Sequence, residues 1–129
     1  MRRKLAPCAP VALHQRDSAA LGFADAAYDQ AVIFFLLHEQ PPLVRKQTIA
    51  EALRVVRPGG KIVIVDYHRP GCLHPLRYLL WPFLRALEPY ALDLWNHDIG
   101  EWLPNAGRLT QIAKRTFYGG LYQKLTITV

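Results

Sequence analysis

The segment that decides the fold runs from residue 28 to residue 66 and reads YDQAVIFFLLHEQPPLVRKQTIAEALRVVRPGGKIVIVD. Its two apolar runs, Ala31–Leu37 and Ile62–Val65, are continuous, which is typical of strands buried on both faces. Between them, apolar residues at positions 49, 52, 53 and 56 have the spacing of one helical face. Pro42 suits the first turn of that helix, and the Pro-Gly-Gly sequence at 58–60 stops it. The segment predicts a strand–helix–strand crossover, the unit from which parallel sheets are built.

Weaker patterns flank this crossover on both sides. Val11–Arg16 is compatible with a short strand. Downstream, residues 112–118 and 121–129 flank Gly119-Gly120, which is a hairpin signal. In the second of these runs, Leu125, Ile127 and Val129 alternate with polar residues, so that one face meets a core. The sequence therefore predicts an α/β fold in which a parallel core is finished by an antiparallel hairpin.

A segment rich in Leu, Trp, Tyr and Pro lies between the crossover and the hairpin. Pro75 is expected to begin a helix there, Pro82 to kink it and Pro89 to end it. Its apolar stripe consists of Leu73, Leu76, Leu80, Phe83 and Leu87, with Arg77 and Arg85 off the stripe. Two interpretations remain open: a helix that covers the sheet, or the wall of an apolar substrate pocket that also touches a membrane.

Composition excludes several classes of protein. The chain has 129 residues, of which 51% are hydrophobic and 20% charged, too apolar for a disordered chain. Cys8 and Cys72 lie far apart without a CxxC spacing, which indicates neither a zinc ribbon nor a disulfide framework. Cys72 and His74 are too isolated to propose as metal ligands. The longest apolar run is far shorter than the roughly 20 residues of a membrane span, so a cytoplasmic protein is expected.

The net charge of +6 is spread unevenly. Residues 41–85 hold eight basic and two acidic residues, whereas 86–105 hold four acidic and no basic ones. Such a chain binds nucleic acid, rests on the inner face of an anionic membrane, or simply has a basic solvated surface. Its aromatic residues are not interleaved with the cations and no nucleic-acid motif occurs, so we expect no nucleic-acid partner.

Three stretches together resemble the class I S-adenosylmethionine (SAM)-dependent methyltransferases. They are VALHQRDSAALGFADAAYD (11–29), AVIFFLLH (31–38) and ALRVVRPGGKIVIVD (52–66). The resemblance implies a Rossmann-like sheet of order 3-2-1-4-5-7-6, of which this chain would supply strands 3, 4 and 5 and the antiparallel 6/7 hairpin. The chain has no GxGxG or GxGxxG loop. Residues 11–129 are therefore expected to be the C-terminal portion of one methyltransferase-like domain, after an unstructured start at 1–10.

A narrower resemblance rests on VDYHRP (65–70), LEPYALDLW (87–95) and FYGGLYQKLTIT (117–128). These stretches resemble the rhodoquinone biosynthesis methyltransferase-like proteins, relatives of the ubiquinone and menaquinone C-methyltransferases. In that group the cofactor is thought to serve the replacement of a methoxy group by an amino group. The resemblance implies a small apolar, quinone-like substrate.

The superfamily resemblance also implies contacts to SAM. Asp17 matches the acidic residue that accepts a hydrogen bond from the adenine amino group, and Ser18 supplies the neighbouring N–H. Phe34 and Phe35 match the end of the fourth strand, where members touch the cofactor. The alternatives are that Asp17 only forms a turn and that the two phenylalanines only pack in the core.

Two further groups follow the carboxyl ends of the two buried strands, where open α/β sheets bind ligands. After the first strand, His38 and Glu39 are the candidate catalytic residues, with His38 taking a proton from the substrate. After the second, Tyr67, His68 and Arg69 are candidates for contact with a quinone ring. The alternatives are a loop histidine that caps a helix and ordinary loop packing.

The missing strands have physical consequences. Without strands one and two, Val11–Arg16 has no neighbour and should be disordered, and Ala31–Leu37 exposes an apolar edge. We expect the chain alone to bind SAM weakly or not at all. Two alternatives then remain. The chain is a truncated transferase whose first two strands come from elsewhere, for example from a partner chain. Otherwise it is a non-catalytic remnant that pairs its exposed strand edge with another polypeptide.

Overall fold

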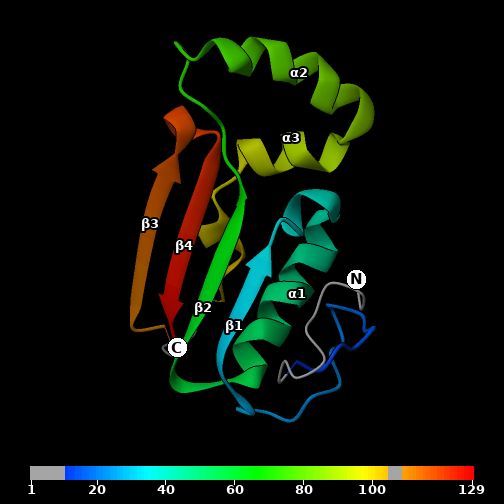
Figure 1. The fold of residues 1–129 in the computed structure, drawn as a ribbon, viewed down its shortest axis with the longest axis vertical. Coiled ribbons are helices and arrows are strands. Elements are labelled where there is room, and N and C mark those ends of the chain that lie inside the picture. The colour runs from blue at the N-terminus through cyan, green and yellow to red at the C-terminus, as the bar shows by residue number, and fades with distance from the viewer. Residues whose placement is uncertain (1–10, 105–108) are drawn as a thin grey trace.

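A four-stranded mixed sheet of order β1-β2-β4-β3 organises the protein in a computed structural model that describes residues 11–104 and 109–129 (Figure 1). The start expected to be unstructured, residues 1–10, lies outside the described residues. The strand order corresponds to the 4-5-7-6 half of the sheet that the resemblance implied, so the α/β class and the partial Rossmann-like sheet are confirmed.

The predicted crossover is present. It consists of β1 (Tyr28–Phe34), α1 (Pro42–Val55) and β2 (Val56–Tyr67). The two strands are parallel, with Ile33 opposite Ile64. Buried residues of α1, including Ile49 and Ala52, belong to the same core cluster as these strands, so α1 covers one face of the sheet (Figure 1).

The predicted hairpin closes the other side of the sheet. β3 (Gln111–Phe117) and β4 (Tyr122–Thr128) are joined by the 3-10 turn η4 (Tyr118–Gly120), and β4 pairs antiparallel with both β2 and β3. Gly119 has a φ of 66°, a conformation that glycine adopts at no steric cost. Leu125, Ile127 and Val129 are buried, as the alternation predicted.

The expectation that both apolar strands are buried on both faces is wrong. Val32 is 60% and Phe34 65% exposed, and Val63 and Val65 are only half-buried. Among the described elements, α1 covers one face of the sheet, and these side chains lie on the other. β1 also ends at Phe34 rather than at Leu37, because the next residue has a φ of 48° and the chain then turns into η2 (Leu37–Glu39).

The strand expected at Val11–Arg16 does not form. Residues 11–16 are not paired with any strand, and only an isolated bridge between Asp17 and Ala20 follows. A strand needs a neighbour to satisfy its backbone groups, and in the described sheet β1 is an edge strand that these residues do not reach.

Two helices stand at the end of the sheet where β2 finishes (Figure 1). They are α2 (Pro75–Leu87), which continues past Pro82, and α3 (Pro89–Asn96), followed by η3 (Ile99–Trp102). Helix α2 packs on α3 rather than on the face of the sheet, whereas Leu94 of α3 and Ile99 belong to the core cluster of the sheet. The first interpretation therefore holds for the second half of this segment and not for α2. Its buried residue is Leu84, and most of the predicted stripe is exposed. Neither these helices nor α1 is long and apolar enough to cross a membrane.

Candidate active site

His38 and Asp66 meet where β1 and β2 end. His38 is buried in η2, and Asp66 is completely buried near the end of β2. The two residues come together because the strands are parallel and in register, with Phe34 opposite Val65. The distance between His38 Nδ1 and Asp66 Oδ1 is 2.8 Å. This placement agrees with the rule that ligands bind at the carboxyl ends of parallel strands.

Asp66 accepts hydrogen bonds at both oxygens. Oδ2 accepts from the backbone N–H of Leu37 at 2.7 Å, and Oδ1 accepts from the backbone N–H of Tyr67 at 2.8 Å as well as from the imidazole. Because the carboxylate accepts from Nδ1–H, the neutral ring of His38 carries its lone pair on Nε2. That nitrogen is the one able to take a proton from a ligand.

Two glutamates lie beside Nε2 of His38. Glu39 Oε1 is 3.9 Å away and Glu88 Oε2 is 4.0 Å away, both too far for a hydrogen bond. Glu39 is exposed, whereas Glu88 Oε2 is buried and makes no hydrogen bond within the described structure. Both carboxylates therefore lie near Nε2 without forming a hydrogen bond to it.

Aromatic rings surround this histidine. The ring of Tyr67 is centred 4.4 Å from that of His38, and Phe35 lies 6.2 Å from His38. Tyr122 stacks with Tyr67 at 5.8 Å and meets Phe35 edge-to-face at 5.5 Å. We call Phe35, His38, Tyr67 and Tyr122 the aromatic cluster. The left-handed backbone of Phe35 is fixed by a 2.9 Å hydrogen bond from its N–H to the carbonyl of Val65.

A cavity of about 130 Å³ adjoins the aromatic cluster. It is lined by Tyr67, Leu80, Phe83, Leu84, Glu88, Trp95, Leu121 and Tyr122. A cavity of about 150 Å³ holds benzene, so this volume suits one six-membered ring. Glu88 Oε2 and Trp95 Nε1 are buried without a hydrogen-bond partner in the described structure, and both belong to lining residues.

Tyr67 remains protonated at neutral pH. Burial raises the pKa of its hydroxyl, and the negative charges of Glu88 and neighbouring groups raise this pKa further. Its backbone carbonyl accepts from Gln123 Nε2 at 2.7 Å, which ties the residue to β4. The hydroxyl is therefore a hydrogen-bond donor for a carbonyl or phenolic oxygen.

Of the other predicted site residues, one touches this cluster and the rest do not. Phe34 lies on the open face of β1, and its ring meets that of Phe35 edge-to-face at 4.7 Å. His68 Nδ1 lies 2.8 Å from the carbonyl oxygen of Gly120, and Arg69 lines a different cavity. The exposed Asp17 accepts from the N–H of Ala19 at 2.8 Å, which is a turn interaction.

Ser18 connects indirectly to the catalytic segment. Its Oγ accepts a hydrogen bond from Gln40 Nε2 at 2.9 Å and lies 3.0 Å from Thr48 Oγ1. Gln40 directly follows η2, which carries His38 and Glu39. Ser18 is thereby joined to the residue that follows the segment of the catalytic candidates.

Glu88, Trp95 and Tyr122 were not identified as site residues from the sequence. Glu88 stands between the last turn of α2 and Pro89, which begins α3, and the corner between the two helices brings it to His38. Tyr122 lies on the polar face of β4, and its pairing with Tyr67 depends on the register between β2 and β4. For these three residues the sequence offered only one local indication of a site, the acidic Glu88 between the end of one predicted helix and the proline that begins the next.

Comparison with known proteins confirms the resemblance. A methyltransferase domain family matches residues 1–64. The chain is 33% identical over 108 residues to an uncharacterized methyltransferase of Synechocystis, covering 80% of this chain and 48% of that protein. It is 30% identical over 119 residues to a demethylmenaquinone methyltransferase of Beutenbergia cavernae, covering 85% and 49%. The chain thus spans about half the length of these curated relatives.

A solved methyltransferase structure shares the fold of this chain. A SAM-dependent methyltransferase from Thermotoga maritima superposes with a TM-score of 0.65 at 13% identity, covering 86% of this chain and 60% of that one. The chain is therefore related to the class I SAM-dependent methyltransferases. Within that superfamily, its relatives include methyltransferases named for quinone substrates.

Proposed function

We propose that this chain provides the substrate half of a SAM-dependent methyltransferase that acts on a quinol, the reduced form of a quinone. The observation that carries the proposal is the buried His38–Asp66 pair beside a ring-sized cavity with aromatic walls. The demethylmenaquinone methyltransferase relative supports a quinone-type substrate.

The proposed chemistry uses His38 as a base. His38 does not itself line the cavity but lies next to two residues that do, with its ring 4.4 Å from that of Tyr67 and its Nε2 4.0 Å from Glu88 Oε2. In the proposed step, a quinol hydroxyl at this wall passes its proton to Nε2, and Asp66 stabilises the imidazolium. Removal of this proton raises the electron density on the neighbouring ring carbon, which is the carbon to be methylated. After methylation this carbon loses its own hydrogen as a proton, which restores the aromatic ring. Tyr67 donates a hydrogen bond to the second oxygen of the ring. When bound, SAM supplies the methyl group.

The residues present fit SAM only in part. The exposed carboxylate of Asp17 and the exposed ring of Phe34 suit an adenosyl group. The sequence has no GxGxG or GxGxxG loop for the methionine end. We therefore expect the 129-residue chain alone to bind SAM weakly or not at all. Titration calorimetry checks this, and micromolar affinity would contradict it.

The cavity assignment can be tested with phenol, a single six-membered ring with a hydroxyl group that does not react with the exposed thiol of Cys72. We expect Leu80→Trp to fill the cavity and weaken phenol binding at least tenfold, by analogy with the roughly 1–3 kcal/mol discrimination of hydrophobic pockets. Leu79→Trp is the matched control, because Leu79 is exposed and does not line the cavity. Equal binding by both variants, or none by the wild type, would remove the cavity from the proposal.

The narrower resemblance adds a ubiquinone-type ring and replacement of a methoxy group by an amino group, in which an amine donor forms the new carbon–nitrogen bond and the methoxy group leaves as methanol. The motifs at 65–70, 87–95 and 117–128 support this extension. Mass spectrometry of the quinone produced in cells that express the protein together with the N-terminal strands of the family's sheet distinguishes an added methyl group from an amino group. If the Asp66→Asn variant formed the same amount of modified quinone as the wild type, neither reaction would take place at this site.

A further inference from the structure

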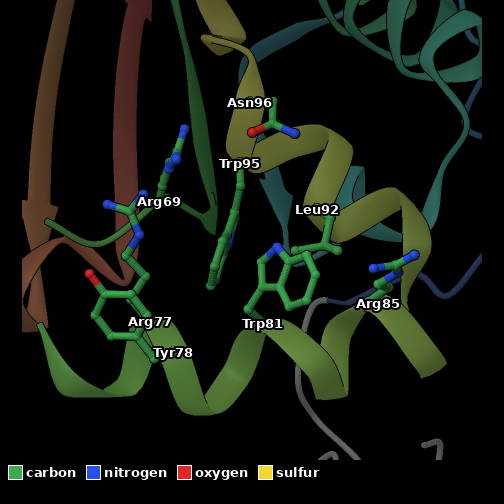
Figure 2. Close-up of a pocket in the computed structure, with 8 residues that line it drawn as sticks. All are labelled: Arg69, Arg77, Tyr78, Trp81, Arg85, Leu92, Trp95 and Asn96. Carbon is green, nitrogen blue, oxygen red and sulfur yellow. The ribbon is translucent and has the colours of Figure 1, made fainter. Parts of the chain in front are cut away.

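A second cavity lies on the other side of Trp95 from the predicted catalytic residues. It has a volume of about 480 Å³ and lies between the loop after β2, α2 and α3 (Figure 2). It is lined by Arg69, Arg77, Tyr78, Trp81, Arg85, Leu92, Trp95 and Asn96. We call it the arginine cavity. Neither the proposed transfer reaction nor the aromatic cluster uses its three guanidinium groups.

The arginine cavity concentrates positive charge. Its described lining residues include three arginines and no acidic residue. Arg69 and Arg77 come from the same end of the cavity, where Arg77 reaches the residue that follows Arg69, and Arg85 lies at the other end beyond Trp81 (Figure 2). The Arg85 guanidinium is 5.2 Å from the centre of the Trp81 ring. Within the described parts of the chain, none of the three forms an ion pair within 4 Å, and Arg77 only reaches the carbonyl of Pro70 at 3.5 Å.

The surface around the cavity is apolar. Leu73 is 95% exposed, and Leu79, Phe83 and Leu87 on α2 are also exposed. Single exposed apolar residues are common, but here they gather on α2 and just before it, beyond the end of the sheet (Figure 1). Arginine beside tryptophan and leucine is the composition of helices that lie in the membrane interface.

We propose that the arginine cavity binds the phosphate headgroup of an anionic phospholipid while the outer side of α2 lies in the membrane interface. Arg69 and Arg77 form a fork of donors suited to a phosphate, and the two tryptophans contact the glycerol and upper chain region. Exposed leucines contribute to contact with lipid chains but nothing to a nucleic-acid backbone, which favours the membrane. This inference does not depend on which reaction the protein catalyses.

Vesicle flotation with the full 129-residue chain tests the proposal. Vesicles contain either phosphatidylcholine alone or equal parts of phosphatidylcholine and phosphatidylglycerol. We expect binding to the anionic vesicles that weakens with salt, and little binding to the neutral ones. The double variant Arg69→Gln/Arg77→Gln should bind about 25-fold more weakly, because each interfacial arginine contributes about fivefold.

The matched control is Arg57→Gln/Lys61→Gln, which removes the same charge from the exposed first half of β2, at the opposite end of the sheet (Figure 1). If both double variants lose binding to anionic vesicles equally, only the net charge matters, and the proposed phosphate site is overturned. Equal binding to both kinds of vesicle also overturns it.

Two further measurements separate the sources of phosphate and the role of folding. Leu73→Ser/Leu79→Ser changes side chains that are exposed, so the fold should remain while binding to anionic vesicles falls several-fold. Unchanged binding would show that α2 does not enter the interface. Glycerol 3-phosphate at millimolar concentration should compete poorly with vesicles. Tight binding of this free phosphate without binding to vesicles would replace the membrane with a soluble ligand and overturn the proposal.

Discussion

His38 Nδ1 lies 2.8 Å from Asp66 Oδ1, although 28 residues separate them in the sequence. The contact depends on the parallel register of β1 and β2, which brings the residues after one strand beside the last residues of the other. Because Asp66 also accepts from the backbone N–H of Leu37, one carboxylate both orients the imidazole and fixes the turn that carries it.

Asp66→Asn should destabilise the protein and disturb His38. An amide offers one acceptor oxygen where the carboxylate has two, so either the N–H of Leu37 or the imidazole loses its acceptor. The free energy of unfolding should fall by about 1–3 kcal/mol, the cost of a buried unsatisfied group. Urea denaturation measures this loss. Nitrogen NMR should show the wild-type imidazole protonated on Nδ1 in its neutral form; protonation on Nε2 instead would contradict the orientation described.

Among the basic residues of the described structure, we expect substitution of Arg45 to lower the free energy of unfolding most. Its side chain is fully buried and donates from Nε to the carbonyl of Leu37 at 2.7 Å and from a terminal nitrogen to Asp93 at 2.6 Å. It also lies over the ring of Trp102. Arg45→Met removes every donor, and we expect a loss of about 3 kcal/mol, as for other broken buried pairs.

The matched control for this change is Lys46→Met on the same helix. Lys46 is exposed, so its replacement should alter the free energy of unfolding by less than about 0.5 kcal/mol. If both substitutions lowered the free energy of unfolding equally, the buried hydrogen bonds of Arg45 would contribute nothing beyond its charge.

The periodicity of the sequence predicted the crossover and the hairpin because both depend on local patterns. It failed where tertiary partners decide the outcome. An apolar run at 31–37 indicates burial but not how many faces are covered, and Phe34 is 65% exposed. Likewise, the stripe on α2 predicted an apolar face, yet the packing of α2 on α3 buries Leu84.

The site was predictable only in part, for a similar reason. His38 and Tyr67 follow strand signals, so the topology alone brings them together. Glu88 and Tyr122 depend on the corner between two helices and on the register of an antiparallel pair. Arg69 follows Tyr67 by two residues, but the chain turns away and carries it to the arginine cavity.

Glu51 should make stability depend on pH in the acid range. A side-chain hydrogen bond from Arg54, together with one from the backbone N–H of Leu21, lowers its pKa from 4.5 to about 2. A group with a lowered folded pKa contributes stability above its unfolded pKa and loses it as pH falls through the folded value. The difference in urea midpoint between wild type and Glu51→Gln should therefore be full above pH 4.5 and narrow towards pH 2. A constant difference across that range would contradict the assignment.

The open side of β1 should control self-association. Val32 and Phe34 are exposed on the edge strand of the sheet, and exposed apolar edges are templates for pairing with another chain. Val32→Lys/Phe34→Lys should keep the fold, because neither side chain is buried, and should shift the chain from oligomers to monomers in sedimentation velocity at the same concentration. The control is Ile112→Lys/Phe117→Lys on β3, the strand at the opposite edge, whose side chains are also exposed. We expect this control to associate like the wild type, since only the β1 edge adjoins the strands that the family's sheet order would add. Two outcomes would show that β1 is not the associating edge. The first is that the β3 variant becomes monomeric while the β1 variant does not, and the second is that the wild-type chain is monomeric at every concentration.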